Sequence, residues 1–93
     1  MPRGKVKRII DGDTFELRSG EHVRIANLNA PELDERGGQQ AKRRLQNKMP
    51  RGTEVGISKP LAKSYGRVVR KVTINQKDIT KLVGSTTPRS RRK

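Results

Sequence analysis

The sequence predicts a mainly β domain with some α-helix: a five-stranded Greek-key barrel of the OB type, with one helix between the third and fourth strands and a short C-terminal helix. Two observations support this class. The chain has 93 residues, of which 29% are hydrophobic and only two are aromatic, so it can build one small core. Five short runs suited to strands surround one run with helical spacing, in the order that is usual for this barrel.

The first three strands are expected at residues 5–10, 14–18 and 22–28. Turn-forming residues at 11–13 separate the first two strands, and residues 19–20 supply a hairpin turn before the third. The second run alternates between apolar and polar residues, which is typical of a strand with one buried face. The third run is apolar on both sides in places, so its periodicity alone does not say which face is interior.

A helix is expected at residues 39–49, because Ala41, Leu45 and Met49 recur at four-residue spacing and form a narrow apolar stripe among lysines and arginines. The segment Pro50-Arg51-Gly52 ends this helix, since neither proline nor glycine continues it well.

The last two strands are expected at residues 54–58 and 67–74, joined by a basic loop at 59–66. Thr80 is expected to cap a short helix that runs through Val83, because a threonine hydroxyl can accept a hydrogen bond from a free amide of the first turn. These elements complete the predicted barrel.

The net charge of +14, from 23 Lys and Arg against 9 Asp and Glu, makes nucleic acid the leading partner. Phosphates relieve the self-repulsion of so basic a domain, and their neutralisation supplies most non-specific affinity. One folded domain is expected at residues 1–84. Residues 85–93 contain no core-forming residue and are expected to be a disordered basic tail that adds to this affinity. A protein that is merely basic and soluble is the alternative.

The composition disfavours several other classes. The chain has no Cys and one His, which excludes disulfides and thiolate metal sites and disfavours a zinc site of usual composition. No apolar run is long enough to cross a membrane, and no basic helix with an apolar face suits a membrane surface. We therefore expect a monomeric, cytoplasmic protein. A leader removed before this sequence was recorded is an open alternative.

Four short segments carry side chains suited to phosphodiester chemistry, and the first is Ile10-Asp11-Gly12-Asp13-Thr14. Asp13 shares its parity with Phe15 and Leu17, which puts a carboxylate at the end of the apolar face, where it needs a cation or several donors. Asp11 fits ordinary turn chemistry better, since a carboxylate often accepts from a nearby amide.

Arg24, within the third strand, and Arg67, in Tyr65-Gly66-Arg67, carry permanent positive charge, and a guanidinium binds phosphate oxygens in bidentate fashion. Lys63 in the same loop as Tyr65 is expected to contact phosphate. The alternatives are an arginine that snorkels from a barrel rim and a turn glycine between a half-buried tyrosine and a solvated arginine.

The segment Asn29-Ala30-Pro31-Glu32 follows the third strand. Taken alone, Pro-Glu after a strand is an ordinary loop start. A carboxylate beside the arginines, however, can hold a hard cation or take a proton from water.

In this order, the four segments closely resemble the staphylococcal nuclease (thermonuclease-like) family, over about residues 5–83. The resemblance implies an OB-fold nuclease domain, shortened at the C-terminus, where members usually continue into helices that close the nucleotide site. It implies a calcium-dependent endonuclease, a hydrolase that cuts phosphodiester bonds of DNA, RNA or both with little sequence specificity.

The resemblance also implies a role for each matched residue. The implied catalytic residues are the two phosphate-binding arginines and a general base: Arg24, Arg67 and Glu32. The implied calcium ligands, the third through its main-chain carbonyl, are Asp13, Asn29 and Ala30. The residues expected to contact substrate are Lys63, Tyr65 and Thr14.

Asn29 departs from the family, which carries an aspartate at this position. Because calcium affinity depends on the number of charged ligands, the sequence predicts weak, altered or absent metal binding. The alternative function is a catalytically impaired nuclease-like module that only binds nucleic acid. A structural RNA-binding protein of the ribosomal kind is a third hypothesis, but it gives no reason for the acid and arginine positions to occur together.

Overall fold

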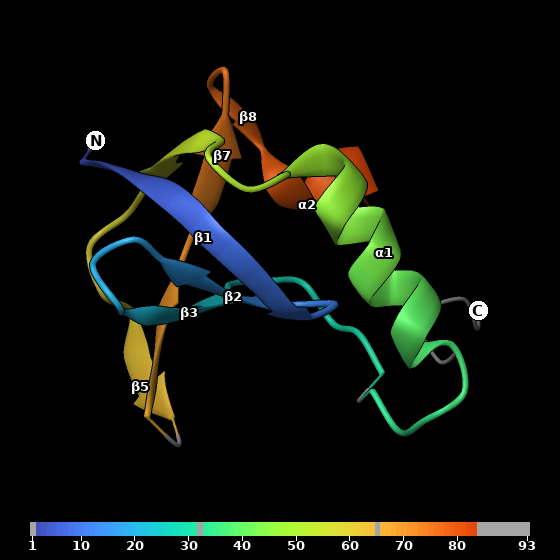
Figure 1. Ribbon diagram of the computed structural model, residues 1–93. Helices are drawn as coiled ribbons and strands as arrows, with labels where there is room; N and C mark the ends of the chain where they lie inside the picture. The colour runs from blue at the N-terminus through green and yellow to red at the C-terminus, as the bar shows by residue number, and fades with distance from the viewer. Residues whose placement is uncertain (1, 32, 65, 84–93) are drawn as a thin grey trace.

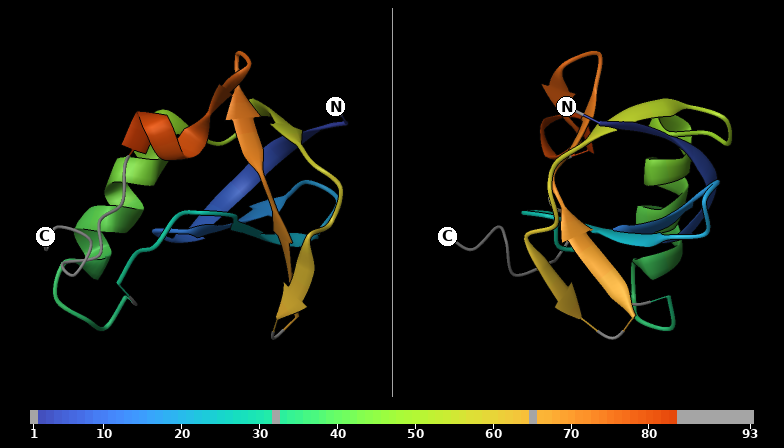
Figure 2. Two further views of the ribbon diagram at one scale, coloured as in Figure 1. Left: turned by 180° about the vertical axis from the view of Figure 1, so that it is seen from behind. Right: turned by 90° about the vertical axis from the view of Figure 1, so that its left-hand side faces the viewer.

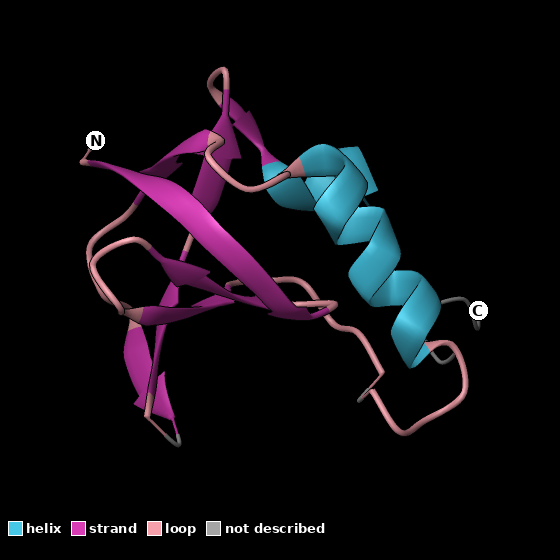
Figure 3. Cartoon of the chain, viewed as in Figure 1, coloured by secondary structure: helices cyan, strands magenta, loops and turns pink. Residues whose placement is uncertain are grey.

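The computed structural model describes residues 2–31, 33–64 and 66–83, and within them it is mainly β with two helices, as predicted (Figures 1 and 3). The strands and helices, in chain order, are β1 (Arg3–Asp11), β2 (Thr14–Leu17), β3 (His22–Ile25), α1 (Gly38–Lys48), β4 (Glu54–Ile57), β5 (Ala62–Ser64), β6 (Arg67–Arg70), β7 (Val72–Ile74), β8 (Lys77–Asp78) and α2 (Ile79–Val83).

The strands close into a barrel-like ring because one segment of chain pairs on two sides. The sheet order is β5-β6-β3-β2-β1-β4-β7-β8, and β6 and β7 are separated only by Lys71. β6 runs parallel to β3, whereas β7 runs antiparallel to β4. The end view in Figure 2 shows the resulting closed curve of strands. A sheet closed in this way leaves few exposed edges.

β1 changes neighbours along its length. Its first part pairs with β4, through Arg3–Gly56, Gly4–Val55 and Lys5–Glu54, and its second part pairs with β2. The register with β2 shifts twice, between Val6 and Arg8 and between Ile9 and Asp11. Such irregularities increase local twist and bend a strand, which lets β1 serve both halves of the ring.

The core fills the ring and extends under the two helices. Its largest fully buried apolar side chains come from five strands, the loop after β3 and both helical segments: Phe15, Ile25, Leu28, Leu45, Met49, Ile79, Val6, Val23, Val55 and Val72. The apolar stripe predicted for the central helix is confirmed, because Ala41, Leu45 and Met49 are all buried. The α1 helix thus lies with this stripe against the barrel (Figure 1).

Four details of the predicted fold were wrong. Eight strands occur instead of five: the expected strand at 67–74 is divided between β6 and β7, and β5 and β8 are additional. β5 lies in the expected basic loop and forms by pairing with β6. The third strand ends at Ile25, because Asn27 has a positive φ of 64° that an extended strand does not allow. Asp78 rather than Thr80 caps α2, since its Oδ1 accepts from the Thr80 amide at 2.9 Å.

The predicted basic tail at 85–93 lies outside the described residues. Within the described ranges, no helix is both long enough and apolar enough to cross a membrane.

Candidate functional site

Asp13 is held in the turn between β1 and β2. Its amide donates to Asp11 Oδ1 at 3.1 Å, so Asp11 performs the turn chemistry expected of it. Its carbonyl accepts from the Ile25 amide at 2.8 Å, which fixes the turn against β3. The Asp13 residue is only 8% exposed, so a carboxylate from this turn is buried at the end of the barrel strands.

Arg24 meets this carboxylate from the neighbouring strand. Thr14 and Arg24 are direct partners in the β2–β3 pairing. Arg24 Nη2 lies 3.3 Å from Asp13 Oδ2, and Arg24 Nη1 donates to the Ile25 carbonyl at 2.9 Å. The guanidinium is therefore held at the barrel surface by two contacts, and its side chain remains partly exposed.

Arg67 reaches the same place from β6, more than fifty residues further along the chain. Its Nη1 donates to Thr14 Oγ1 at 3.3 Å, and that hydroxyl donates to Asp13 Oδ1 at 3.0 Å. The two predicted arginines thus lie on either side of one Asp13–Thr14 pair. We call Asp13, Thr14, Arg24 and Arg67 the acid–arginine cluster.

The charge on Asp13 is only partly compensated in this cluster. Burial raises the pKa of Asp13 to about 6, and the nearby Asp11 carboxylate acts in the same direction. Arg24 and the Thr14 hydroxyl oppose this rise but do not cancel it. An additional cation at Asp13 would therefore be stabilised electrostatically.

Gly12 brings the predicted calcium-site segment next to this turn. A Cβ built on Gly12 would lie 2.6 Å from the Cβ atoms of both Ala30 and Ala41. Real Cβ atoms do not approach so closely, so only glycine lets the turn, the loop after β3 and helix α1 come together. Gly12 was predicted only as a turn residue, although its place between two aspartates was a signal for this close approach.

The remaining predicted residues are not all brought together. Glu32 and Tyr65 lie outside the described residues, so the structure leaves their roles as predictions. Asn29 is exposed and Ala30 half-buried in the loop after β3. Lys63 pairs with Val68, whereas Arg67 pairs with Ser64. Because neighbouring strand residues alternate between faces, Lys63 lies on the opposite face of the β5–β6 hairpin from Arg67.

The three predicted metal ligands suit a hard cation in kind. A carboxylate, an amide oxygen and a main-chain carbonyl are the ligands that calcium prefers. Charged ligands are few, however, because the described part of the chain contains no group of three or more His, Cys, Asp or Glu that could hold a metal. Of Asp13, Asn29 and Ala30, only Asp13 carries a charge.

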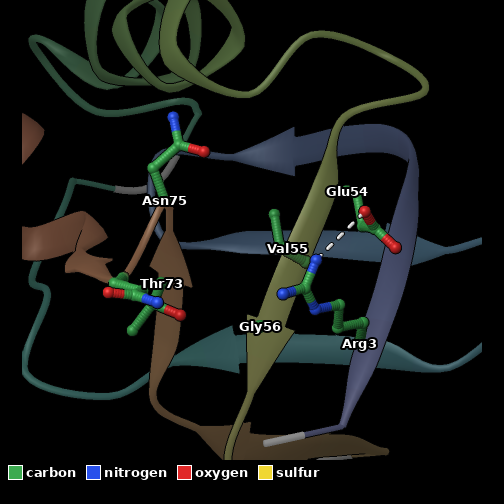
Figure 4. A pocket seen from close by; sticks show the side chains of 7 residues that line it. Arg3, Glu54, Val55, Gly56, Thr73 and Asn75 are labelled. Atoms are coloured by element: carbon green, nitrogen blue, oxygen red, sulfur yellow. Dashed lines mark hydrogen bonds and ion pairs between the residues drawn. The ribbon is translucent and has the colours of Figure 1, made fainter.

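A pocket of about 680 Å³ lies elsewhere, beside β1, β4 and the β7–β8 turn (Figure 4). Its lining includes the exposed ion pair between Arg3 and Glu54, and it contains none of the predicted site residues. We take the acid–arginine cluster as the candidate site, because charged side chains converge there and the pKa of Asp13 is shifted. The residues that line the pocket are Arg3, Glu54, Val55, Gly56, Thr73, Asn75 and Gln76.

Fold and site together define a small barrel-like β domain in which a buried acid meets two half-buried arginines. The chain is similar to the micrococcal nuclease of Shigella flexneri, with 37% identity over 70 residues. The similarity covers 72% of this chain and 40% of that protein, so the chain spans well under half the length of this relative. No protein-family model matches the chain. The similarity supports a relationship to nucleases of this kind.

Proposed function

We propose that this protein is a metal-dependent nuclease that hydrolyses phosphodiester bonds of DNA, RNA or both with little sequence specificity. The observation that carries the proposal is the meeting of Arg24 and Arg67 at the Asp13–Thr14 pair. The similarity to a micrococcal nuclease and the net charge of +14 support the same substrate class. The ring of β1, β2, β3, β6–β7 and β4 is consistent with an OB-type barrel.

The two arginines would act on the phosphate. Hydrolysis at phosphorus builds negative charge on the phosphate oxygens in the transition state, and donors fixed before the reaction stabilise that charge best. Arg24 is held by a main-chain carbonyl and Arg67 by a hydroxyl, so both guanidiniums are oriented in advance. By resemblance, Glu32 would take the proton of the attacking water, and the cut would leave a 3′-phosphate.

Asp13 would hold the cation, together with the oxygens of Asn29 and Ala30. The bound cation would supply positive charge near the phosphate and an ordering centre for water. Its affinity is expected to be low, because Asn29 brings no charge to the site. The affinity for the cation should also fall as the pH drops through about 6, because the Asp13 carboxylate becomes protonated there and a metal must displace the proton.

A nucleic-acid-binding module without turnover is the second candidate. It is favoured by the small number of charged donors near Asp13, since no group of three metal-binding side chains occurs in the described ranges. The buried Asp13 argues against it, because a carboxylate paired with one of the two arginines opposes phosphate binding unless it has another task.

The test is release of acid-soluble nucleotides from single-stranded DNA and from RNA, with calcium added or chelated. The wild-type protein should release nucleotides only with the cation, and Glu32→Gln should abolish most of the release. Glu35→Gln is the matched control, because it makes the same change three residues further along the same loop. A wild-type protein that binds both substrates but releases nothing would establish the binding module instead.

A further inference from the structure

A second charged group lies on the outer side of the first three strands. Arg8, Glu16 and His22 are directly opposite one another in the β1–β2 and β2–β3 pairings. Arg8 Nε lies 2.7 Å from Glu16 Oε1, Lys7 Nζ lies 3.7 Å from Glu16 Oε2, and His22 Nε2 lies 3.8 Å from Glu16 Oε1. Three basic side chains therefore lie within 4 Å of the Glu16 carboxylate. We call Lys7, Arg8 and His22 the basic row.

The carboxylate is covered while the bases remain accessible. The Glu16 side chain is only 10% exposed, but that of Arg8 is 64% exposed. Arg8 contacts Glu16 through Nε alone, and its two Nη groups have no partner in the described part of the chain. A guanidinium held by one nitrogen, with its fork open to solvent, is ready for bidentate binding of phosphate oxygens.

Arg70 is an arginine with a structural role in the same molecule, and it serves as a comparison for Arg8. Its Nε also lies 2.7 Å from a glutamate, Glu21, but Nη2 donates to that carboxylate at 3.1 Å and Nη1 to the Ser58 carbonyl at 2.6 Å. Its side chain is only 14% exposed. Arg70 thus uses all its nitrogens to join chain segments, whereas Arg8 uses one.

The basic row lies beside the acid–arginine cluster on the same face of the strands. In β2 and β3, the pair Thr14–Arg24 is two residues away from the pair Glu16–His22, and the core residues Phe15 and Val23 lie between them on the other face. Arg8 is paired with Glu16, so it is a diagonal cross-strand neighbour of Thr14, and such neighbours are about 7–8 Å apart. That spacing is comparable to the separation of neighbouring phosphates along a nucleic-acid strand.

We propose that Arg8, supported by Lys7 and His22, forms a second phosphate-binding position that takes the phosphate next to the one held by Arg24 and Arg67. The role of Glu16 is positioning: it holds the Arg8 guanidinium through Nε. This inference rests on the proposed function, because it takes the acid–arginine cluster as the neighbouring phosphate site. The predicted ligand is a nucleic-acid strand with at least two consecutive phosphates.

The experiment measures binding of a fluorescent single-stranded oligonucleotide of about twelve nucleotides by anisotropy, in chelator and over a range of salt. Arg8→Gln should weaken binding about three- to tenfold and lower the salt slope by about one. The matched control is Arg3→Gln. Arg3 lies on the same strand, pairs with a glutamate and is 67% exposed, yet it stands beside the distant pocket. The Arg3→Gln variant should change oligonucleotide binding by less than about twofold.

A dinucleotide with a single phosphodiester separates a neighbouring-phosphate contact from a general effect. Titrated against the protein by NMR, it should bind wild type and Arg8→Gln equally, since it offers nothing to the basic row. Equal oligonucleotide binding by Arg8→Gln and Arg3→Gln would overturn the inference, and so would weaker dinucleotide binding by Arg8→Gln. Thermal melts of both variants verify that each is folded.

These readouts do not depend on turnover. If the wild-type protein releases no nucleotides with calcium, the proposed nuclease function fails while the contrast between Arg8 and Arg3 in oligonucleotide binding still stands. If the protein is an active nuclease and the two variants bind alike, only the second phosphate position is wrong.

Discussion

Asp13 and Glu16 are three residues apart, and each side chain is nearly buried and paired with an arginine. Their environments nevertheless shift their pKa values in opposite directions. Their side chains are 12% and 10% exposed. Burial raises the pKa of Asp13 to about 6, whereas the hydrogen bond from Arg8 lowers the pKa of Glu16. The difference lies in the partners: Asp13 has one guanidinium at 3.3 Å and an acidic neighbour, and Glu16 has three bases around it.

This contrast separates two kinds of charged group on one hairpin. The acid–arginine cluster leaves a carboxylate short of positive charge, which favours an added cation. The basic row has more bases than its carboxylate neutralises, which favours an added anion. A metal and a polyanion are what a nuclease needs to bring together, and the two groups lie on the same face.

The largest expected effect comes from removing a guanidinium from the acid–arginine cluster. Arg24→Ala or Arg67→Ala should lower kcat/KM for DNA cleavage by about 10²–10³, because donors aimed at developing charge account for losses of this size. Arg3→Ala, far from the cluster, should leave the rate within about twofold. Losses of equal size in all three variants would show that general charge, rather than this cluster, drives the activity.

A smaller effect is expected on stability when the partly compensated carboxylate is neutralised. Because the pKa of Asp13 is raised on folding, its ionisation costs stability as the pH rises from about 4 to above 6. Asp13→Asn should therefore raise the free energy of unfolding at pH 7 by about 1–2 kcal/mol, after allowance for the lost Arg24 pair and for solvent screening.

Urea denaturation of the wild-type protein and Asp13→Asn in chelator, at pH 7 and at pH 4, measures this difference. The gain should nearly disappear at pH 4, where Asp13 is protonated in the folded protein. A variant that is less stable than the wild type at pH 7 would mean that the ion pair with Arg24 outweighs the effect of burial.

The next effect in size is expected on calcium affinity at the proposed metal site. Asn29→Asp should strengthen calcium binding about tenfold, since it adds a charged ligand beside Asp13. Isothermal titration calorimetry with calcium chloride measures the dissociation constant directly. Asn27→Asp adds the same charge two residues away, in a turn with positive φ that aspartate tolerates. If both variants bind calcium alike, position 29 is not a ligand.

The smallest effect is expected at Glu16. Its pKa is lowered on folding, so it stabilises the protein above its ordinary pKa of 4.5, and this contribution is lost as the pH falls through its folded value. Glu16→Gln should lower the thermal midpoint slightly at pH 7, and the difference should shrink towards pH 3. A difference that grows on acidification would contradict the assigned direction.

Much of this architecture was predictable from local pattern, because the strand runs, the central helix and the two hairpin turns each have their own sequence signal. Ring closure was not predictable in this way. The segment around Lys71 looks like one continuous valine-rich strand, and only its two sets of partners divide it into β6 and β7. β5 likewise exists because β6 pairs with it, despite the modest strand propensity of its residues.

The site was predictable in its residues more than in its contacts. Resemblance singled out Asp13, Arg24 and Arg67, but the bridge through Thr14 depends on the pairing of β2 with β3 and of β3 with β6. The basic row was missed because Lys7, Arg8 and His22 meet only at Glu16, from which they are separated along the chain. The pairing of Glu16 with His22 could have been inferred by extending the hairpin register from the turn at residues 19–20, but the pairing of Arg8 with Glu16 depends on the shifted register of β1 and β2.

The most direct measurement of the central claim is a crystal structure of the protein with a short single-stranded oligonucleotide. We predict that Arg24 and Arg67 will both lie within hydrogen-bonding distance of oxygens on the same phosphate, above the Asp13–Thr14 pair. A phosphate bound by only one of these arginines, or an oligonucleotide seated in the pocket beside Arg3, would contradict the account.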